Sequence, residues 1–173
     1  VQDTTVAMSL DTVTTASIDQ PGKTANFTFS VTESTPVLFD GANASGDFYW
    51  SLRGPGGMQV ARRSMNSNPA FGESQYLSLA PGDYTLSVDA NLATTGDVSF
   101  RLASRAATQS LALDQVTSGT LDASRGSAFY RVTLNPGKYY LEGRGVTNGA
   151  INARLIGQYG GLAISTPLTT PVA

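Results

Sequence analysis

The chain has 173 residues with no cysteine and no histidine, and its 11 Lys and Arg against 13 Asp and Glu give a net charge of -2. This composition excludes disulfides, thiolate nucleophiles, a Ser-His-Asp triad and Cys/His zinc sites, and the scarcity of basic residues argues against a nucleic-acid surface. Hydrophobic residues make up 40% of the chain, enough for a globular core, while no apolar run approaches the roughly 20 residues of a membrane span.

Short strands are predicted along most of residues 10–104. The polar segment 1–9 is expected to be an arm or a linker, and residues 10–19 a short edge strand. Beyond them, alternating apolar and polar residues are typical of half-buried strands, and no segment has sustained helical spacing. The segments expected to form strands are 24–31, 36–40, 48–53, 58–62, 75–79, 84–89 and 96–103.

One turn-and-strand phrase occurs twice. In Leu79-Ala-Pro-Gly-Asp-Tyr-Thr-Leu-Ser-Val-Asp89, a Pro-Gly turn precedes a strand with Tyr84, Leu86 and Val88 on one side. The phrase returns as Leu134-Asn-Pro-Gly-Lys-Tyr-Tyr-Leu-Glu142. The chain is therefore expected to use the same local construction in two places.

A longer internal repeat starts near residue 113. Leu10-Asp-x-Val-Thr14 matches Leu113-Asp-x-Val-Thr117 at an offset of 103 residues, and Phe27 then meets Tyr130. The second copy lacks counterparts of residues 75–102. We expect it to pack on the first copy; alternatively it recruits residues 1–10 or pairs with a neighbouring segment.

These patterns predict an all-β fold, an antiparallel β-sandwich of jelly-roll-like type with a second, partial repeat of the same pattern. The predicted organisation is an arm at 1–9, a sandwich at 10–104, the partial repeat at 105–165 packed on the first copy, and a linker tail at 166–173. Because the chain begins at Val1 without a signal-peptide pattern, we expect it to be a piece of something longer.

The order of elements resembles a known family. Asn26-Phe-Thr-Phe-Ser-Val31, Tyr49-Trp-Ser-Leu-Arg-Gly-Pro-Gly-Gly57 and the phrase at 79–88 are similar to the bacterial pre-peptidase C-terminal (PPC-like) β-sandwich modules. Such modules stand beside catalytic domains in secreted peptidases and recur in large surface adhesins, near laminin-G-like or carbohydrate-binding domains. The chain looks more like the adhesin version, which implies a bacterial extracellular or cell-surface location.

Oxygen donors cluster in one loop. Asp40, Asn43 and Asp47 carry the hard ligands that calcium prefers. Their spacing is not that of an EF-hand or of a nonapeptide calcium repeat, and a turn rich in Asp and Asn is the commoner explanation of such a loop. Related clostridial collagenase modules bind calcium, but the chain has no matching acidic N-terminal linker.

A ligand surface is a second hypothesis. Trp50 alternates with Phe48 and Leu52 and is expected in the core, whereas Tyr49 faces the other way and could stack on a sugar. The remaining candidate ligand contacts are the basic pair Arg62 and Arg63 and, in the loop at 64–74, Phe71. Each has a simpler interpretation as an ordinary exposed side chain.

No catalytic constellation is expected. Lys23 and Lys138 both follow Pro-Gly turns, where exposure would leave their amines unactivated, and the acids are scattered singly. We therefore expect no enzyme but a module that spaces or presents neighbouring domains of the same large adhesin in cell adhesion. The alternatives are a carbohydrate- or protein-binding module, with calcium as its one candidate cofactor, and an accessory domain of a secreted peptidase.

Overall fold

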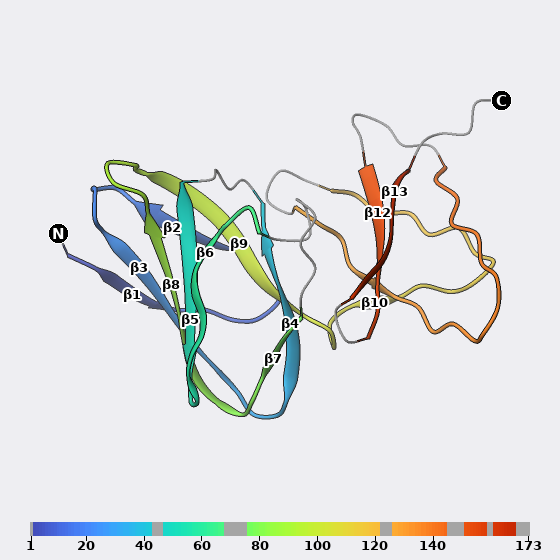
Figure 1. Cartoon of the computed structure of the whole chain (residues 1–173), viewed down its shortest axis with the longest axis horizontal. Coiled ribbons are helices and arrows are strands. Elements are labelled where there is room, and N and C mark those ends of the chain that lie inside the picture. The colour runs from blue at the N-terminus through green and yellow to red at the C-terminus, as the bar shows by residue number, and fades with distance from the viewer. Residues whose placement is uncertain are drawn as a thin grey trace. The chain divides into compact units, whose positions relative to one another are not determined.

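The computed structural model describes residues 2–42, 47–67, 76–121, 126–144, 151–158 and 161–168. Within these ranges the regular elements are β-strands (Figure 1), and no helix there could cross a membrane. The chain divides into two compact units, Val1–Arg131 and Val132–Ala173.

A five-stranded sheet forms one layer of the first unit. Its neighbouring strands are antiparallel except at one edge, where β1 runs parallel to β3. In spatial order the strands are β1 (Thr4–Ala7), β3 (Thr24–Val31), β8 (Gly82–Ala90), β5 (Phe48–Gly54) and β6 (Gly57–Ser64).

A four-stranded antiparallel sheet forms the other layer. The long strand β9 lies in its interior, and the predicted edge strand of residues 10–19 is at its border. In spatial order the strands are β2 (Thr14–Ile18), β9 (Gly96–Ser104), β4 (Thr35–Gly41) and β7 (Leu77–Leu79).

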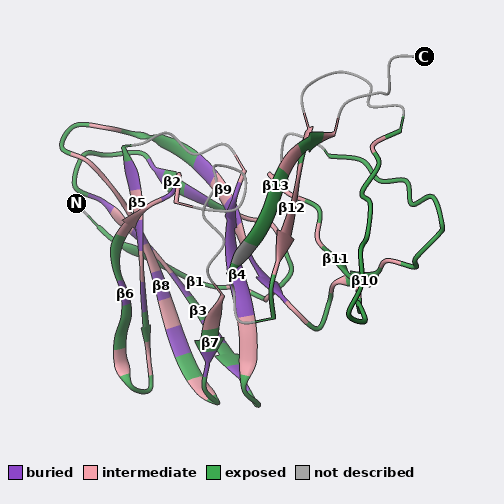
Figure 2. Cartoon of the chain, turned by 45° about the vertical axis from the view of Figure 1, so that its right-hand side comes forward, coloured by how far each residue is buried: buried purple, intermediate pink, exposed green. Residues whose placement is uncertain are grey.

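The core lies between the two sheets and confirms the predicted sandwich. Alternate residues of each strand face inward, so the buried positions in Figure 2 run as bands along the strands. Trp50 on β5 is fully buried, as predicted, and stacks on Phe39 of β4 with ring centroids 4.1 Å apart. The buried cluster includes Phe27, Phe29, Val31, Phe48, Leu52, Tyr84, Leu86, Val88, Val98, Phe100 and Leu102.

The N-terminal segment departs from the expectation of an arm. Residues 4–7 form β1 and pair in parallel with residues 25–28 of β3. All four β1 residues are exposed, so the strand has no buried face to produce an alternating pattern. Backbone hydrogen bonds to the edge of the sheet hold β1 in place, and backbone pairing of this kind produces no recognisable pattern of side chains in the sequence.

The repeat reappears as strand pairing. β10 (Gln109–Ser110) runs parallel to β11 (Tyr130–Arg131), with Gln109 opposite Tyr130. In the first copy, Val6 of β1 lies opposite Phe27 of β3, and the offset of 103 residues relates the two pairs. The backbone hydrogen bond that follows each pair is also repeated, from Met8 N to Thr28 O and from Leu111 N to Arg131 O.

Backbone conformation repeats as well. Asp11 and Asp114, again 103 residues apart, both have a positive φ, of 65° and 57°. Such an angle is uncommon outside glycine, although aspartate tolerates it better than most residues. The repeat found in the sequence is therefore a repeat of backbone geometry.

The second unit contains an antiparallel hairpin of β12 (Ile151–Ile156) and β13 (Leu162–Leu168). It corresponds to the β5–β6 hairpin: Ala153 pairs with Thr166 as Trp50 pairs with Arg63. Since β13 extends to Leu168, the predicted linker tail at 166–173 is wrong for residues 166–168. Pairing with β12 extends through residues 166–168 and orders that part of the backbone.

The boundary between compact units does not fall between the copies. Residues 105–131, predicted to belong to the second repeat, lie in the first unit. The contact of Arg101 on β9 with the ring of Phe129, at 5.2 Å, helps to hold them there. The packing of the second repeat on the first stays a prediction.

The repeated turn phrase makes the same local hydrogen bond twice. The Tyr84 hydroxyl donates to the carbonyl oxygen of Ala80, and the Tyr139 hydroxyl to that of Asn135, each at 2.8 Å and four residues back. In the first copy Tyr84 also stacks on Phe29, with centroids 5.3 Å apart. Gly54 lies against the Tyr84 ring, and its lack of a side chain leaves room for the ring in this position.

We predict that Gly54→Ala destabilises the sandwich by about 1 to 3 kcal/mol, because overpacking forces a well-held ring to move. The added Cβ would clash with Tyr84 Cε1, and Tyr84 is fixed by its stack and its hydrogen bond. Gly56→Ala in the same hairpin is the matched control, since nothing lies within 4 Å of its added Cβ. Urea unfolding of the two variants measures the difference, and equal midpoints would contradict the prediction.

Candidate functional site

The first candidate position, Asp40, is occupied by an internal ion pair. Asp40 is on β4 and Arg101 lies opposite it on β9. Arg101 Nε and Nη2 lie 2.9 and 2.8 Å from Asp40 Oδ2, and only 13% of the arginine side chain and 1% of the aspartate are exposed. Arg101 also donates to the carbonyl oxygen of Ser127.

Burial dominates the electrostatics of Asp40. It raises the pKa of the Asp40 carboxyl above 3.8, because the charged form loses hydration, while the Arg101 charge and hydrogen bonding from Arg101 and Ser127 oppose the rise. Among the described residues Oδ1 finds no partner of normal hydrogen-bond geometry. The carboxylate therefore depends on Arg101 for its compensation.

The structure describes two of the three predicted calcium ligands, Asp40 and Asp47. Asn43 lies outside the described residues, Asp47 is exposed and Asp40 is buried against Arg101. In the described ranges no group of three or more acidic, histidine or cysteine side chains is placed to hold a metal ion. A calcium ion at Asp40 would have to share the carboxylate with a guanidinium, which fits poorly with a hard cation that seeks several free oxygens.

Two candidate ligand contacts, Tyr49 and Arg62, contact each other. The Arg62 guanidinium lies 4.0 Å from the centre of the Tyr49 ring, and Arg62 also pairs with Asp89 Oδ1 at 3.0 Å. Tyr49 is half-buried. One face of the proposed sugar platform is therefore covered by a cation from the same molecule.

The other two candidates are not part of this cluster. Arg63 lies 5.8 Å from the ring centre of the buried Trp50 and is itself half-buried. Phe71 is outside the described residues. The structure thus brings Tyr49 and Arg62 together and adds Asp89 of β8 to them.

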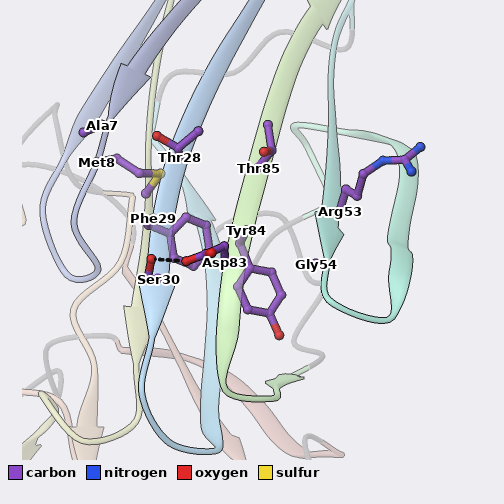
Figure 3. A pocket seen from close by; sticks show the side chains of 10 residues that line it. All are labelled: Ala7, Met8, Thr28, Phe29, Ser30, Arg53, Gly54, Asp83, Tyr84 and Thr85. Atoms are coloured by element: carbon purple, nitrogen blue, oxygen red, sulfur yellow. Dashed lines mark hydrogen bonds between the residues drawn. The ribbon is translucent and has the colours of Figure 1, made fainter.

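A shallow hollow opens on the first unit (Figure 3). It has a volume of about 600 Å³, and its charged groups are Arg53 on β5 and Asp83 on β8. Asp83 Oδ1 accepts a hydrogen bond from Ser30 Oγ at 2.5 Å. The hollow is lined by Ala7, Met8, Thr28, Phe29, Ser30, Arg53, Gly54, Asp83, Tyr84 and Thr85.

Sequence reasoning did not single out the hollow. The alternating pattern of the sequence shows which residues of β3, β5 and β8 are polar and face outward. It does not show the strand register, which aligns Thr28, Thr85 and Arg53 across three strands. The hollow can hold a small polar group by hydrogen bonds. Ser30 and Asp83 form a pair without a basic third group, so the arrangement offers no activated nucleophile.

The expectation of two exposed lysines is wrong for Lys23. Its side chain is only 10% exposed and its Nζ lies 2.9 Å from Asp19 Oδ1. The hydrogen bond from Lys23 lowers the pKa of Asp19. The alkyl stem of Lys23 is covered by the fold while its ammonium group reaches an exposed carboxylate, an arrangement that long side chains often adopt.

Comparisons with known proteins give a likeness among solved structures. No protein-family model matches the chain, and a search of curated proteins gives no match. Among solved structures, the chain is similar to the pre-peptidase C-terminal domain of collagenase from Bacillus anthracis, with 19% identity and a TM-score of 0.41. The match covers 58% of this chain and 94% of that domain.

We predict that Arg101→Gln costs about 3 to 5 kcal/mol of unfolding free energy at pH 7, because removing one partner strands a buried charge. The loss should shrink as the pH falls toward 3.8, since the pKa of Asp40 is raised and the folded variant then holds a neutral carboxyl. Arg62→Gln is the control; that arginine is 51% exposed, and we expect about 1 kcal/mol or less. Urea unfolding at both pH values provides the readout, and a loss from Arg101→Gln that did not vary with pH would contradict this account.

We also predict that calcium leaves the melting temperature of the chain unchanged relative to chelator. Asp40 already has a cationic partner, so the loop gains little from a second one. A site filled at 100 times its dissociation constant would add about 2.7 kcal/mol, which a melting curve resolves. A clear upward shift would instead show that Asp40, Asn43 and Asp47 bind calcium.

Proposed function

We propose that the chain is a non-catalytic module of a large secreted or cell-surface bacterial adhesin, where it spaces and presents neighbouring domains of the same protein. The observation that carries this proposal is the repetition of one β-sandwich plan at a fixed offset, seen in the parallel β1–β3 and β10–β11 pairs with equivalent registers. Tandem copies of one plan add length in equal steps, and each copy needs contacts only with its neighbours.

The use of polar groups in the first copy supports a scaffold role. The guanidinium groups of Arg62 and Arg101 and the ammonium group of Lys23 are each paired with a carboxylate of the same unit. Charged side chains that are paired within the unit stabilise its fold and are less available to bind a ligand. The sequence resemblance to PPC-like modules of adhesins agrees with this role.

The hollow on the first unit favours a second candidate, a carbohydrate- or protein-binding module. Arg53 is exposed at its rim and Asp83 is exposed across from it (Figure 3). A guanidinium and a carboxylate on a polar sheet face can bind carboxylate or hydroxyl groups of a ligand. The hollow is open and shallow, so this candidate ranks below the scaffold role.

Exchanging the module in its host adhesin tests the scaffold role. Replacing the chain with an unrelated β-sandwich of similar end-to-end length should preserve adhesion of the cells, whereas deletion without replacement should weaken it. The paired variant Arg53→Ala with Asp83→Ala, in the otherwise unchanged host, should adhere normally. If both the exchange and the paired variant abolished adhesion, the hollow would be the binding site and the scaffold role would be wrong.

A further inference from the structure

The hollow on the first unit is lined by a row of residues that crosses four strands. Arg53 of β5 lies opposite Thr85 of β8, and Thr85 lies opposite Thr28 of β3. Ala7 of β1 continues the row beyond Thr28. Because facing residues of paired strands project from the same side of a sheet, the three polar side chains line one surface (Figure 3).

Asp83 gives the hollow a second charge on the same face. It lies opposite Ser30 and two residues before Thr85 on β8, which makes it a diagonal neighbour of Arg53. Diagonal neighbours in antiparallel strands have Cα atoms about 7 to 8 Å apart, and the ion pairs among the described residues do not include one between these two charges. A ligand can therefore contact both groups without breaking a bond between them.

The polar groups in the hollow are free, whereas another charge on the same face is already paired. Asp89 of β8 is bound by Arg62. Within the described part of the chain, the Arg53 guanidinium and the hydroxyl groups of Thr28 and Thr85 have no hydrogen-bonding or ionic partner. The hollow thus contains a cation and two hydroxyl groups that are available to a ligand.

The chemistry of these groups selects the groups of the ligand. The planar guanidinium of Arg53 matches a carboxylate, which it binds through two parallel hydrogen bonds. The Asp83 carboxylate accepts hydrogen bonds from hydroxyl groups, as it already does from Ser30 Oγ at 2.5 Å, and threonine hydroxyls both donate and accept. The hollow is therefore complementary to a molecule with one carboxylate and several hydroxyl groups.

The spacing of the two charges favours a ligand of the size of a sugar ring. The α-carboxylate and α-ammonium groups of an amino acid are on one carbon, closer together than diagonal neighbours on a sheet. A pyranose ring instead holds its carboxylate and its far hydroxyl groups on opposite sides and can reach both Arg53 and Asp83. Met8, which is half-buried at the hollow, offers an apolar surface to the C–H groups of the ring.

We propose that the hollow binds a hexuronic acid residue, with its carboxylate on Arg53 and its ring hydroxyl groups on Asp83 and Thr85. This inference rests on the second candidate function, in which the hollow is a ligand site, and it names the class of the ligand. Because the hollow is shallow and open, we expect binding in the millimolar range. Binding of that strength agrees with the expectation that the host adheres normally when the hollow is altered.

An NMR titration of the intact chain tests the proposal. Sodium glucuronate and sodium galacturonate, added at constant ionic strength, should shift the backbone amide signals of residues 28–30, 53–54 and 83–85 in a saturable way. Glucose and galactose lack the carboxylate and acetate lacks the ring hydroxyl groups, so each should bind about tenfold more weakly. Equal binding of acetate would show an adventitious ion only, and this would overturn the proposal.

Matched variants test the assigned contacts. Arg53→Gln should weaken uronate binding by about tenfold, whereas Arg131→Gln removes an exposed arginine outside the hollow and should leave binding unchanged. Thr85→Val keeps the shape of the side chain and should weaken binding by about threefold, the effect of one neutral hydrogen bond. Because Arg53 is exposed, its variant should keep the urea midpoint of the unchanged chain. Equal weakening by Arg53→Gln and Arg131→Gln would show non-specific attraction and overturn the proposal.

The results also separate this inference from the functions proposed above. If glucose and galactose shifted the same residues as strongly as the uronates, the hollow would still be a ligand site and the assigned class of ligand would be wrong. If none of the compounds shifted these residues, the carbohydrate-binding candidate would be wrong together with this inference. The scaffold role depends on neither result, because exchange of the module tests it separately.

Discussion

The contact between Trp50 and Phe39 is the constraint on which the sandwich depends, because it joins the two sheets at their centre. Trp50 is on the five-stranded sheet and Phe39 on the four-stranded one, with their rings nearly parallel at 6°. Phe100 contacts Phe39 on its own sheet and Phe27 on the opposite one. Large rings that meet across the layer fix both the spacing of the sheets and the register in which they face each other. The cost is a Trp50 indole N–H that is buried without a hydrogen-bond partner among the described groups.

The sequence predicted most of this packing because a strand with one buried face must alternate. The residues predicted to share an inward face on β5 and β8, for example Trp50, Leu52, Leu86 and Val88, are all buried. The β5–β6 hairpin follows from Gly54-Pro-Gly-Gly57, since glycine supplies the positive φ that the turn uses at Gly57. Side-chain pattern and turn chemistry are local properties, so a single sequence carries them.

Features held by the backbone or by distant partners could not be predicted in the same way. β1 has no buried side chain and is fixed by pairing with β3. Asp40 and Arg101 are 61 residues apart, and nothing near Asp40 in the sequence signals that its partner is a guanidinium. The oxygen donors of the loop therefore suggested a calcium ion, whereas the cation beside Asp40 in the fold is the guanidinium of Arg101. Tyr49 similarly suggested an open ring, which Arg62 of the neighbouring strand partly covers.

The topology makes a single strand, β8, the link on which the five-stranded sheet depends. In the spatial order β1-β3-β8-β5-β6, the strand β8 stands at the centre although it is among the last to be made along the chain. Every contact between the early pair β1–β3 and the later pair β5–β6 within the sheet passes through it. In the described part of the second copy, the counterpart strands form two two-stranded sheets, β10–β11 and β12–β13. Two-stranded sheets are marginally stable alone, so a sheet of this plan depends for its stability on the central strand that joins its two halves.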